Sequence, residues 1–422
     1  MSDSQYRILD RESLPEYLSG IPAVLSVLHD GQPVTASDID IVEIGDGNLN
    51  FVYRVTSQAD VSRSVIVKQA VPYLRMVGEE WPLSRDRMTF EIRALQIYNE
   101  VVPDLVPKIF HADEEMSTLV MQYLDDHIIL RQGMIDGIYY PKVAEHIGGF
   151  LAETLFRTSA WSMSSEERRA LMDRFTMNAE LCKLTEEFIF TFPYMEHESN
   201  YSNPTTDAWA KANIHTDTQY KLDVLRFKDL FVAKTDALLH ADLHTGSLMV
   251  NEAESYVIDM EFAYFGPFGF DVGKVISNFL LAATSHFERD GGAEYRTWLI
   301  DQIAVIWDTF HDRFLALWRE SADSTMLVDG LLTDAEFDRL ADQFMLDLLR
   351  ESAGFCACSM ARRTVGIAGV ADVCDIEDSE RRAALEIANL KLSKKVMAER
   401  HELSTIADLQ SLARDFYASQ DL

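Results

Sequence analysis

The chain has 422 residues, of which 47% are hydrophobic and 25% are charged, a composition typical of folded globular proteins. Its formal net charge of −31 at pH 7 argues against nucleic acid as the main partner, because phosphate backbones bind to basic surfaces. No apolar run approaches the roughly 18–20 residues of a membrane helix, and the polar start MSDSQYRILDRE lacks the apolar core of a secretory signal. We therefore expect a cytoplasmic protein of two or three domains with no membrane partner.

Short strand patterns dominate the first part of the chain. Residues 1–38 read as an appended element, with a helix over SLPEYLSGIPAVLSVL. The apolar pattern from residue 39 to residue 124 predicts strands in IDIVEI, FVYRV, SVIVKQA and STLVMQYL, interrupted by one helix, DRMTFEIRALQIYNEV.

Helical patterns dominate after Asp125, with one strand pair, SLMV and SYVID, as the main exception. The sequence therefore predicts an α+β protein, with a small β-rich lobe over residues 1–124 and a larger, mostly helical lobe over residues 125–422. The cysteines lack a metal-binding spacing, and we expect reduced thiols in or near a helical core: Cys182, Cys356, Cys358 and Cys374. The predicted helices include HIGGFLAETLFRTSAW, AEYRTWLIDQIAVIWDTFHDRFLALW and FDRLADQFMLDLLRESAGF.

The segment EIGDGNLNFVYRV carries turn-forming residues between two predicted strands. Glycines there permit close backbone approach, so exposed amides can cradle a phosphate, although a plain hairpin is the simpler interpretation. Lys68 follows at the end of a strand, and Glu91 follows on the next helix. This order favours a lysine that contacts phosphates and is held in place by a glutamate.

Three acids surround the second strand pair. Asp259 and Glu261 are two residues apart on a strand or its extension, so their side chains are expected on one face as oxygen ligands of Mg²⁺. The hairpin returns the chain, so Asp242 can face the same cavity as a general base. His240 and His244 allow a zinc site on residue type alone, but no third nitrogen or sulfur ligand is evident.

We interpret two further residues near this strand pair as structural: His240 as a hydrogen-bonded loop anchor and Asp271 as a helix N-cap. Arg362 and Arg363 are adjacent on a predicted helix and point about 100° apart. They either clamp a phosphate or a sugar, or form an ordinary surface pair.

Together these motifs resemble the protein-kinase-like small-molecule kinases and, among them, the 5-methylthioribose kinase family. The strings that carry the resemblance run in order from about residue 41 to residue 373, and include IVKQAVPY, GEEWPLSRDRMTFE, HADLHTGS, VIDMEFAYFGPFGFDVG and ARRTVGIAGVAD. The resemblance implies a bilobal kinase-like fold with an antiparallel N-terminal sheet. It also implies transfer of the γ-phosphoryl group of ATP to the 1-hydroxyl of 5-methylthioribose with Mg²⁺, in a homodimer of the methionine salvage pathway.

The resemblance also assigns residues. Asp242 corresponds to the catalytic acid–base, and Arg362 and Arg363 to a twin arginine at the sugar site. Asp259 and Glu261 correspond to the metal-binding pair, with Ser247 as a possible weaker metal contact. The nucleotide-binding positions would be Gly45, Asp46, Gly47, Asn48, Asn50, Lys68 and Glu91, with Gln122, Tyr123 and Leu124 as the adenine hinge.

Two spacers depart from the family pattern: Ala241 stands where the family has glycine, and Met260 where it has proline. Both changes affect loop geometry more than chemistry. The alternatives are a related kinase for another 5-substituted ribose, an aminoglycoside or choline, or a nucleotide-binding pseudokinase. The twin arginine argues against a polycationic aminoglycoside, and retention of Lys68 and the acids argues against a pseudokinase.

Overall fold

The computed structural model describes residues 6–45, 49–75, 78–200, 203–321, 324–366 and 369–420. The chain divides into two compact units. Unit 1 comprises Met1–His127 and Tyr256–Ala263, and unit 2 comprises Ile128–Ser255 and Tyr264–Leu422. The chain thus leaves unit 2 for a short segment after Ser255, and that segment carries Asp259 and Glu261. The predicted boundary between residues 124 and 125 stays a prediction.

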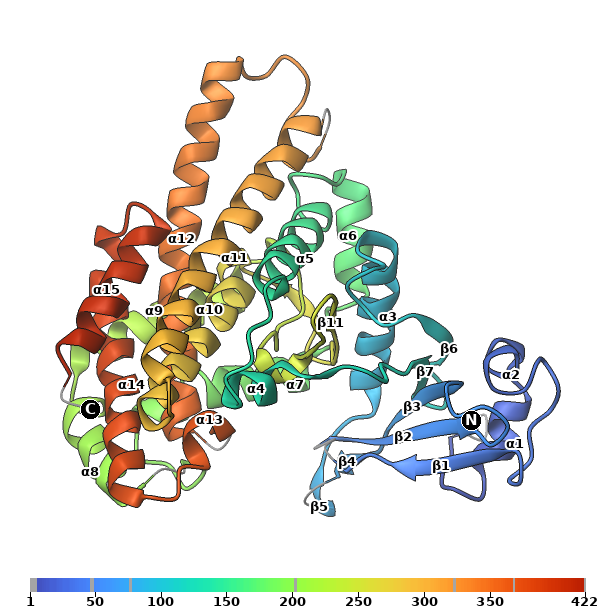
Figure 1. The fold of residues 1–422 in the computed structure, drawn as a ribbon. Coiled ribbons are helices and arrows are strands. Elements are labelled where there is room, and N and C mark those ends of the chain that lie inside the picture. The colour runs from blue at the N-terminus through green and yellow to red at the C-terminus, as the bar shows by residue number, and fades with distance from the viewer. Residues whose placement is uncertain are drawn as a thin grey trace. The chain divides into compact units, whose positions relative to one another are not determined.

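Unit 1 is built on an antiparallel five-stranded sheet in the order β1-β2-β3-β7-β6 (Figure 1). The hairpin from β1 to β2 was expected from the turn-forming residues between them, and the strands align Glu43 with Tyr53. A separate two-stranded ribbon, β4 with β5, carries Trp81. The strands of unit 1 are β1 (Ile39–Glu43), β2 (Asn50–Ser57), β3 (Ser64–Ala70), β4 (Tyr73–Leu74), β5 (Gly78–Pro82), β6 (Ile109–Asp113) and β7 (Thr118–Gln122).

Helices contact both faces of this sheet. The predicted N-terminal helix forms as two short helices, α1 (Leu14–Ser19) and α2 (Pro22–Leu28), which share a buried core with Val65 and Val67 of β3. Lys68 follows Val67 and therefore points to the opposite face, because side chains alternate along a strand. The helix α3 (Asp86–Val101) contacts β3, β6 and β7 and carries Glu91, so Lys68 faces α3.

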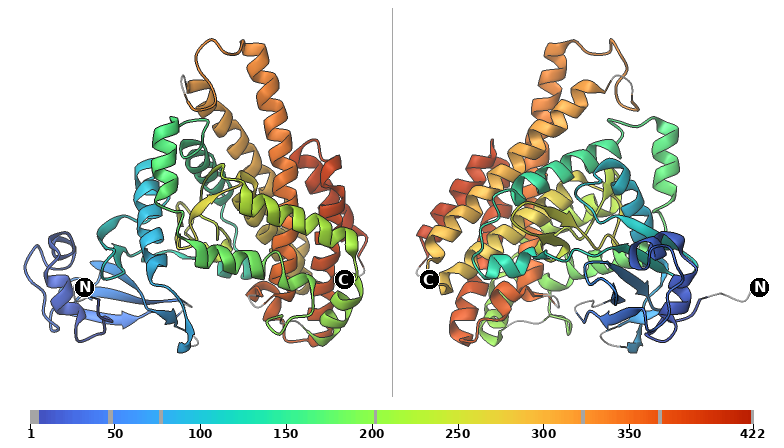
Figure 2. Two further views of the ribbon diagram at one scale, coloured as in Figure 1. Left: turned by 180° about the vertical axis from the view of Figure 1, so that it is seen from behind. Right: turned by 45° about the vertical axis from the view of Figure 1, so that its right-hand side comes forward.

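Unit 2 is mostly helical, and α10 is buried along its whole length. It packs against α11 and α12, while α11 also contacts α5 and α15. The antiparallel pair α11 and α12 extends beyond the other helices of this unit to a connecting turn (Figures 1 and 2). The α-helices are α4 (Leu130–Ile135), α5 (Val143–Arg157), α6 (Ser165–Asp173), α7 (Ala179–Phe188), α8 (Pro204–Asn213), α9 (Thr218–Ala233), α10 (Phe268–Ser285), α11 (Gly292–Glu320), α12 (Asp334–Val365), α13 (Ala371–Cys374), α14 (Ser379–Glu399) and α15 (Ile406–Ala418).

Short strands support the loops of unit 2. The antiparallel pair β9 with β12 flanks the loop of Asp242, and β8 pairs with β10. The predicted hairpin is confirmed as two short strands joined by a turn, in which the Asn251 N–H donates to the Glu254 carbonyl at 3.1 Å. The strands of unit 2 are β8 (Ile128–Ile129), β9 (Ala237–Leu239), β10 (Leu248–Val250) and β12 (Tyr264–Gly266). The strand β11 (Ser255–Val257) begins at Ser255 of unit 2 and continues into the segment assigned to unit 1.

The predicted α+β fold is confirmed, with antiparallel strands in the N-terminal part and helices in the larger part. The long helical patterns are confirmed as α5, α11 and α12, and α12 continues through the twin arginine. Cys356 and Cys358 are buried free thiols in α12, as expected. Among the described residues, no helix is both long and apolar enough to cross a membrane.

Candidate functional site

A lysine and three carboxylates meet in unit 1. The ammonium of Lys68 on β3 donates to Glu91 Oε1 on α3 at 2.8 Å, and also to the carboxylate of Asp259. Carboxylate oxygens of Glu91, Asp259 and Glu261 lie within 4.8 Å of one another. We call these four residues the acidic cluster. The structure thus brings together residues that come from three separate segments of the sequence.

Burial and mutual repulsion change the protonation of the acidic cluster. Burial raises the pKa of Glu261 to about 8, and the Asp259 carboxylate acts in the same direction. Burial also raises the pKa of Glu91, although the Lys68 ammonium opposes this. Burial alone would lower the pKa of Lys68, but the surrounding carboxylates raise it above its ordinary value. Lys68 is therefore protonated, and one ammonium does not balance three acids.

Arg87 supplies a second positive charge that the sequence analysis missed. It lies one turn before Glu91 on α3, is 2% exposed, and places Nε 3.6 Å from Glu261 Oε2. Asn50 joins the two, accepting from Arg87 Nε at 3.0 Å and donating to Glu261 Oε2 at 3.0 Å. The signal in the sequence was an arginine beside Met88 on the apolar face of the helix, because a buried arginine needs polar partners.

Asp259 and Glu261 converge for a different reason from the one predicted. The prediction placed them on a strand or its extension, but β11 ends at Val257 and the chain turns at Glu261. Asp259 has φ of +72°, in the left-handed region, so strand alternation does not set the direction of its side chain. The two carboxylates do lie together, but the strand explanation is wrong.

The donor atoms of the acidic cluster suit a hard divalent cation. Mg²⁺ prefers one or two carboxylates together with phosphate oxygens and water. Glu91, Asp259 and Glu261 all offer such oxygens, and Lys68 contacts both Glu91 and Asp259. Within the part of the chain that the structure describes, this group contains no histidine or cysteine, which disfavours zinc.

The expected nucleotide-binding residues of unit 1 lie in two places. Gly45 is exposed after β1, Asn50 is buried beside the acidic cluster, and Asp46, Gly47 and Asn48 lie outside the described residues. Gln122 ends β7, and its N–H donates to the Lys108 carbonyl at 2.9 Å.

The two residues after Gln122 complete the expected adenine hinge. The Tyr123 hydroxyl accepts from Arg54 Nη1 at 3.3 Å, and Leu124 is buried. The carbonyl of Leu124 accepts from the His127 N–H at 3.4 Å. These three positions therefore connect the last central strand of the sheet to the start of unit 2.

A second cluster of charged residues lies in unit 2 around Asp242, in the loop after β9. The Lys274 ammonium on α10 donates to the Asp242 carboxylate, and Arg363 Nη2 on α12 lies 3.8 Å from Asp242 Oδ1. His244 Nε2 lies 3.4 Å from Oδ2. Burial alone would raise the pKa of Asp242, but Lys274, His244 and Arg363 hold it well below its usual range. Asp242 is therefore an ionised carboxylate at neutral pH.

The twin arginine is not an ordinary surface pair. Arg363 is 7% exposed, and Arg362 is partly exposed beside it on α12. Burial lowers the pKa of both guanidinium groups. We call Asp242, His244, Lys274, Arg362 and Arg363 the loop cluster.

Two residues next to the loop cluster, the partly exposed Arg131 and the buried Asp372, were also missed by the sequence analysis. Arg131 on α4 contacts His244 Nδ1 at 3.2 Å and donates to the Thr245 hydroxyl at 3.3 Å. Its Nε lies 3.5 Å from Asp372 Oδ2 on α13. Both residues come from short helices whose sequences give no periodic signal, so only the fold reveals them.

The interpretation of Asp271 as a helix N-cap is wrong. Pro267 occupies the N-cap position, and Asp271 lies inside α10. Its buried carboxylate accepts from the backbone N–H groups of His240 at 2.8 Å and Ala241 at 3.0 Å. The expected anchoring role of His240 is confirmed, because its Nδ1 accepts from the Asp242 N–H at 3.1 Å.

Ser247 is buried within the same loop. Its hydroxyl donates to the Asp242 carbonyl at 2.9 Å, so it ties the ends of the loop together. Its expected metal contact stays a prediction.

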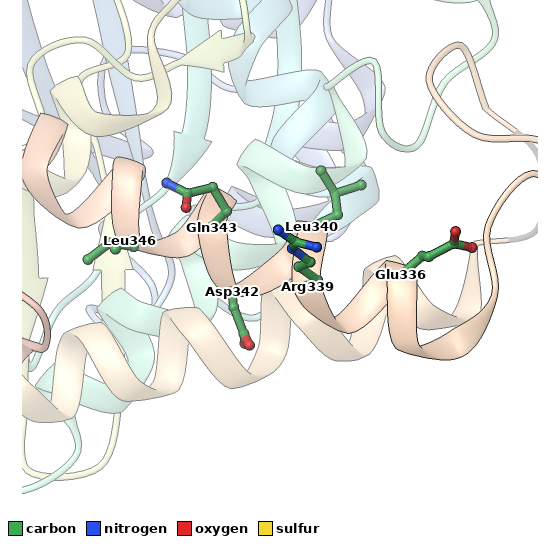
Figure 3. A pocket seen from close by; sticks show the side chains of 6 residues that line it. All are labelled: Glu336, Arg339, Leu340, Asp342, Gln343 and Leu346. Carbon is green, nitrogen blue, oxygen red and sulfur yellow. The ribbon is translucent and has the colours of Figure 1, made fainter.

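A hollow elsewhere on the surface is unrelated to both clusters (Figure 3). Every residue that lines it belongs to α12, at the end near the turn from α11: Glu336, Arg339, Leu340, Asp342, Gln343 and Leu346. It contains none of the residues that carry chemistry above.

A sheet lysine fixed by a helix glutamate, a nearby acid pair, and an ionised aspartate in a separate loop define a class of protein: a phosphotransferase of kinase-like fold. Residues 40–306 match the phosphotransferase enzyme family. The chain belongs to this family.

Within this family the chain is similar to methylthioribose kinases, as predicted. Methylthioribose kinase 1 from Oryza sativa subsp. japonica is 39% identical, over 97% of this chain and 96% of the relative. The methylthioribose kinase from Geobacillus thermodenitrificans (strain NG80-2) is 38% identical, over 92% and 93%. That from Yersinia pseudotuberculosis serotype O:3 (strain YPIII) is 39% identical, over 83% and 84%.

Proposed function

We propose that this protein phosphorylates the 1-hydroxyl of 5-methylthioribose with ATP, giving 5-methylthioribose 1-phosphate and ADP. The observation that carries the proposal is identity of 37–39% to methylthioribose kinases, over nearly the whole of both chains for the two rice relatives. The two charged clusters support it, because phosphoryl transfer depends on positioned charges rather than on covalent chemistry by the protein.

In this proposal the acidic cluster binds the triphosphate. Lys68 contacts its phosphates, and Glu91 holds the ammonium in place. Asp259 and Glu261 would hold Mg²⁺, which neutralises charge on the phosphate oxygens when it is bound. Gly45, Asn50 and the hinge residues Gln122 to Leu124 would bind the remainder of the nucleotide.

The loop cluster binds the sugar in this proposal. Asp242 accepts the proton of the 1-hydroxyl as the oxygen forms its bond to the γ-phosphorus and ADP leaves. An anomeric hydroxyl is more acidic than an ordinary alcohol, which eases transfer of its proton to the Asp242 carboxylate. Arg362 and Arg363 bind the sugar and the transferred phosphoryl group by charged hydrogen bonds.

The charge of the loop cluster disfavours the alternative acceptors. Lys274 and Arg363 place two buried cations beside Asp242, and the partly exposed Arg362 adds a third positive charge to the cluster. A polycationic aminoglycoside or the quaternary ammonium of choline would be repelled there. The acids and Lys68 are all retained, which argues against a pseudokinase. A homodimer and a cytoplasmic location stay predictions.

The test is ATP consumption with 5-methylthioribose, ribose, choline or kanamycin as the acceptor. We expect efficient turnover only with 5-methylthioribose. Asp242→Asn should lower kcat by about 10²- to 10⁴-fold, the usual range for a general base, with ATP affinity nearly unchanged. Asp229→Asn, on the exposed face of α9, is the matched control and should behave as the parent.

Preference for choline or kanamycin would overturn the substrate assignment. Parental turnover by Asp242→Asn would overturn the base assignment.

A further inference from the structure

Helix α10 contacts the loop of Asp242 through two charged residues, one turn apart. Asp271 binds the N–H groups of His240 and Ala241, as described above. Lys274 lies three residues later, and its Nζ donates to the Ala241 carbonyl at 3.0 Å and to Asp242 Oδ1. The helix therefore binds the N–H and the carbonyl of Ala241 and also the carboxylate of Asp242.

This double contact acts on a strained residue. Ala241 has φ of +64°, a left-handed conformation that a residue with a Cβ atom adopts only at a cost. The N–H of Ala241 is fixed by Asp271 and its carbonyl by Lys274. Without Lys274 the Ala241 carbonyl loses this donor, and the peptide between Ala241 and Asp242 keeps the hydrogen bond from the Asp242 N–H to His240 Nδ1. The carboxylate of Asp242 is then held less firmly.

The surroundings of Lys274 show that its charge is directed at Asp242. Lys274 is 4% exposed, and its Nζ lies 5.3 Å from the centre of the Phe270 ring. The acidic residue of the same helix is Asp271, which binds the loop backbone. Burial lowers the pKa of Lys274 to about 8, and the like charges of Arg363 and Arg362 on α12 act in the same direction. Asp242 on the loop is the carboxylate that Lys274 contacts directly and that compensates for these two arginines.

We infer that Lys274 is a positioning residue, whose ammonium fixes the Ala241–Asp242 peptide and Asp242 Oδ1 so that Oδ2 receives the proton of the acceptor hydroxyl. The geometry favours Oδ2 because Lys274 and Arg363 both approach Oδ1, whereas the neighbour of Oδ2 is the His244 ring, with Nε2 at 3.4 Å. This inference rests on the proposed role of Asp242 as the base. Lys274 itself bonds to neither reactant.

The experiment compares Lys274→Ala, Lys274→Met and Lys274→Arg for kcat and KM. Alanine and methionine should lower kcat by about 10- to 100-fold with little change in KM for ATP, because Lys274 contacts the base and not the residues proposed to bind the nucleotide. Arginine retains the charge and the N–H donors and should retain most of the activity. Lys183→Ala, at a side chain that is 70% exposed on α7, is the matched control.

Chemical rescue separates positioning from a merely structural role. Ethylammonium should restore part of the kcat of Lys274→Ala in a saturable way, because it supplies the missing N–H donors and charge. Tetramethylammonium at the same ionic strength has no N–H and should restore nothing. A double variant, Lys274→Ala with Asp242→Asn, should be no slower than Asp242→Asn alone, since Lys274 acts through Asp242.

The inference is overturned if Lys274→Ala turns over at the parental rate while Asp242→Asn is slow, a result that leaves the proposed function intact. It is also overturned if ethylammonium has no effect on Lys274→Ala and the double variant loses kcat by the product of the two single losses. If Lys274→Ala misfolds, Lys274→Met serves for the same comparison. If both variants misfold, the role of Lys274 is structural and the inference is overturned. Parental activity of Asp242→Asn would overturn the proposed base.

Discussion

Arg87 shows how one buried side chain makes the acidic cluster compatible with a folded protein. Besides Asn50 and Glu261, its guanidinium reaches the carbonyls of Ser84 at 2.6 Å and Leu49 at 2.8 Å. A buried ion is tolerated only when its charge and its donors are matched in this way. The carboxylate of Glu261 therefore has a permanent cationic neighbour, whether or not a metal ion is bound.

We predict that Arg87→Met lowers the free energy of unfolding by about 3–5 kcal/mol, the range seen when one partner of a buried pair is removed. The cause is loss of the cation beside Glu261 and of the donors to Ser84 and Leu49. Urea unfolding monitored by circular dichroism measures it. Arg93→Met is the matched control on the same helix: Arg93 pairs with Glu114 at 2.8 Å with both side chains partly exposed, so its loss should cost less than about 1 kcal/mol. Equal losses from the two variants would contradict the prediction.

The residues that sequence reasoning found and those it missed differ in kind. Lys68, Asp242 and the acid pair stand out because a charged residue among apolar strand residues is unusual. Arg87 and Lys274 lie on helices, where charged residues are common, and only tertiary contacts show that they are buried. The spacing of Asp259 and Glu261 correctly predicted that the two side chains lie close together, but for the wrong structural reason. The left-handed φ of Asp259 has no reliable signal in the sequence.

Helix packing in unit 2 depends on glycines whose roles the sequence does not distinguish. Gly148 and Gly149 are neighbours in α5, and the sequence alone does not distinguish them. A Cβ on Gly148 would lie 2.6 Å from the Ile306 carbonyl oxygen and 2.7 Å from Thr309 Cβ on α11, whereas a Cβ on Gly149 would meet no atom of another element within 4 Å. The first glycine allows close approach of two helices, and the second does not.

The two alanine substitutions should therefore have opposite signs. Gly148→Ala should destabilise the protein by about 1–3 kcal/mol, because backbone atoms of α11 must move to admit the methyl group. Gly149→Ala should stabilise it by about 0.5–1 kcal/mol, because alanine loses less conformational entropy than glycine in a helix. Thermal unfolding of both variants beside the parent measures the difference. Equal destabilisation by the two variants would show that the contact between α5 and α11 does not determine the loss of stability.

Periodicity predicted most of the elements but not the short ones. The helix over residues 86–101 agrees with α3, and the long amphipathic patterns became α5, α11 and α12. The strand β6 was missed because IFHAD has two polar residues in five and sits at the sheet edge, where burial imposes little pattern. The assignment of residues 256–263 to unit 1 could not be predicted either, since it depends on contacts far apart in the sequence.

At the scale of the whole molecule, the residues proposed to carry the chemistry are divided between two compact units. Every contact described for the acidic cluster lies within unit 1, and every contact described for the loop cluster lies within unit 2. Most buried polar groups of each cluster therefore find partners without the other unit. Under the proposed function, the two ligands should then bind independently of each other, although turnover needs both.

This division predicts opposite binding defects from two matched substitutions. Lys68→Met should weaken ATP–Mg²⁺ binding by about 10- to 100-fold, equivalent to the loss of one charged hydrogen bond, and leave 5-methylthioribose binding nearly unchanged. Arg363→Met should weaken 5-methylthioribose binding by a similar factor and leave ATP–Mg²⁺ binding nearly unchanged. Isothermal titration of each ligand with the other absent measures both, and each variant should lose turnover. Weakening of both ligands by either substitution alone, in a protein whose circular dichroism matches the parent, would mean that the two units do not bind independently.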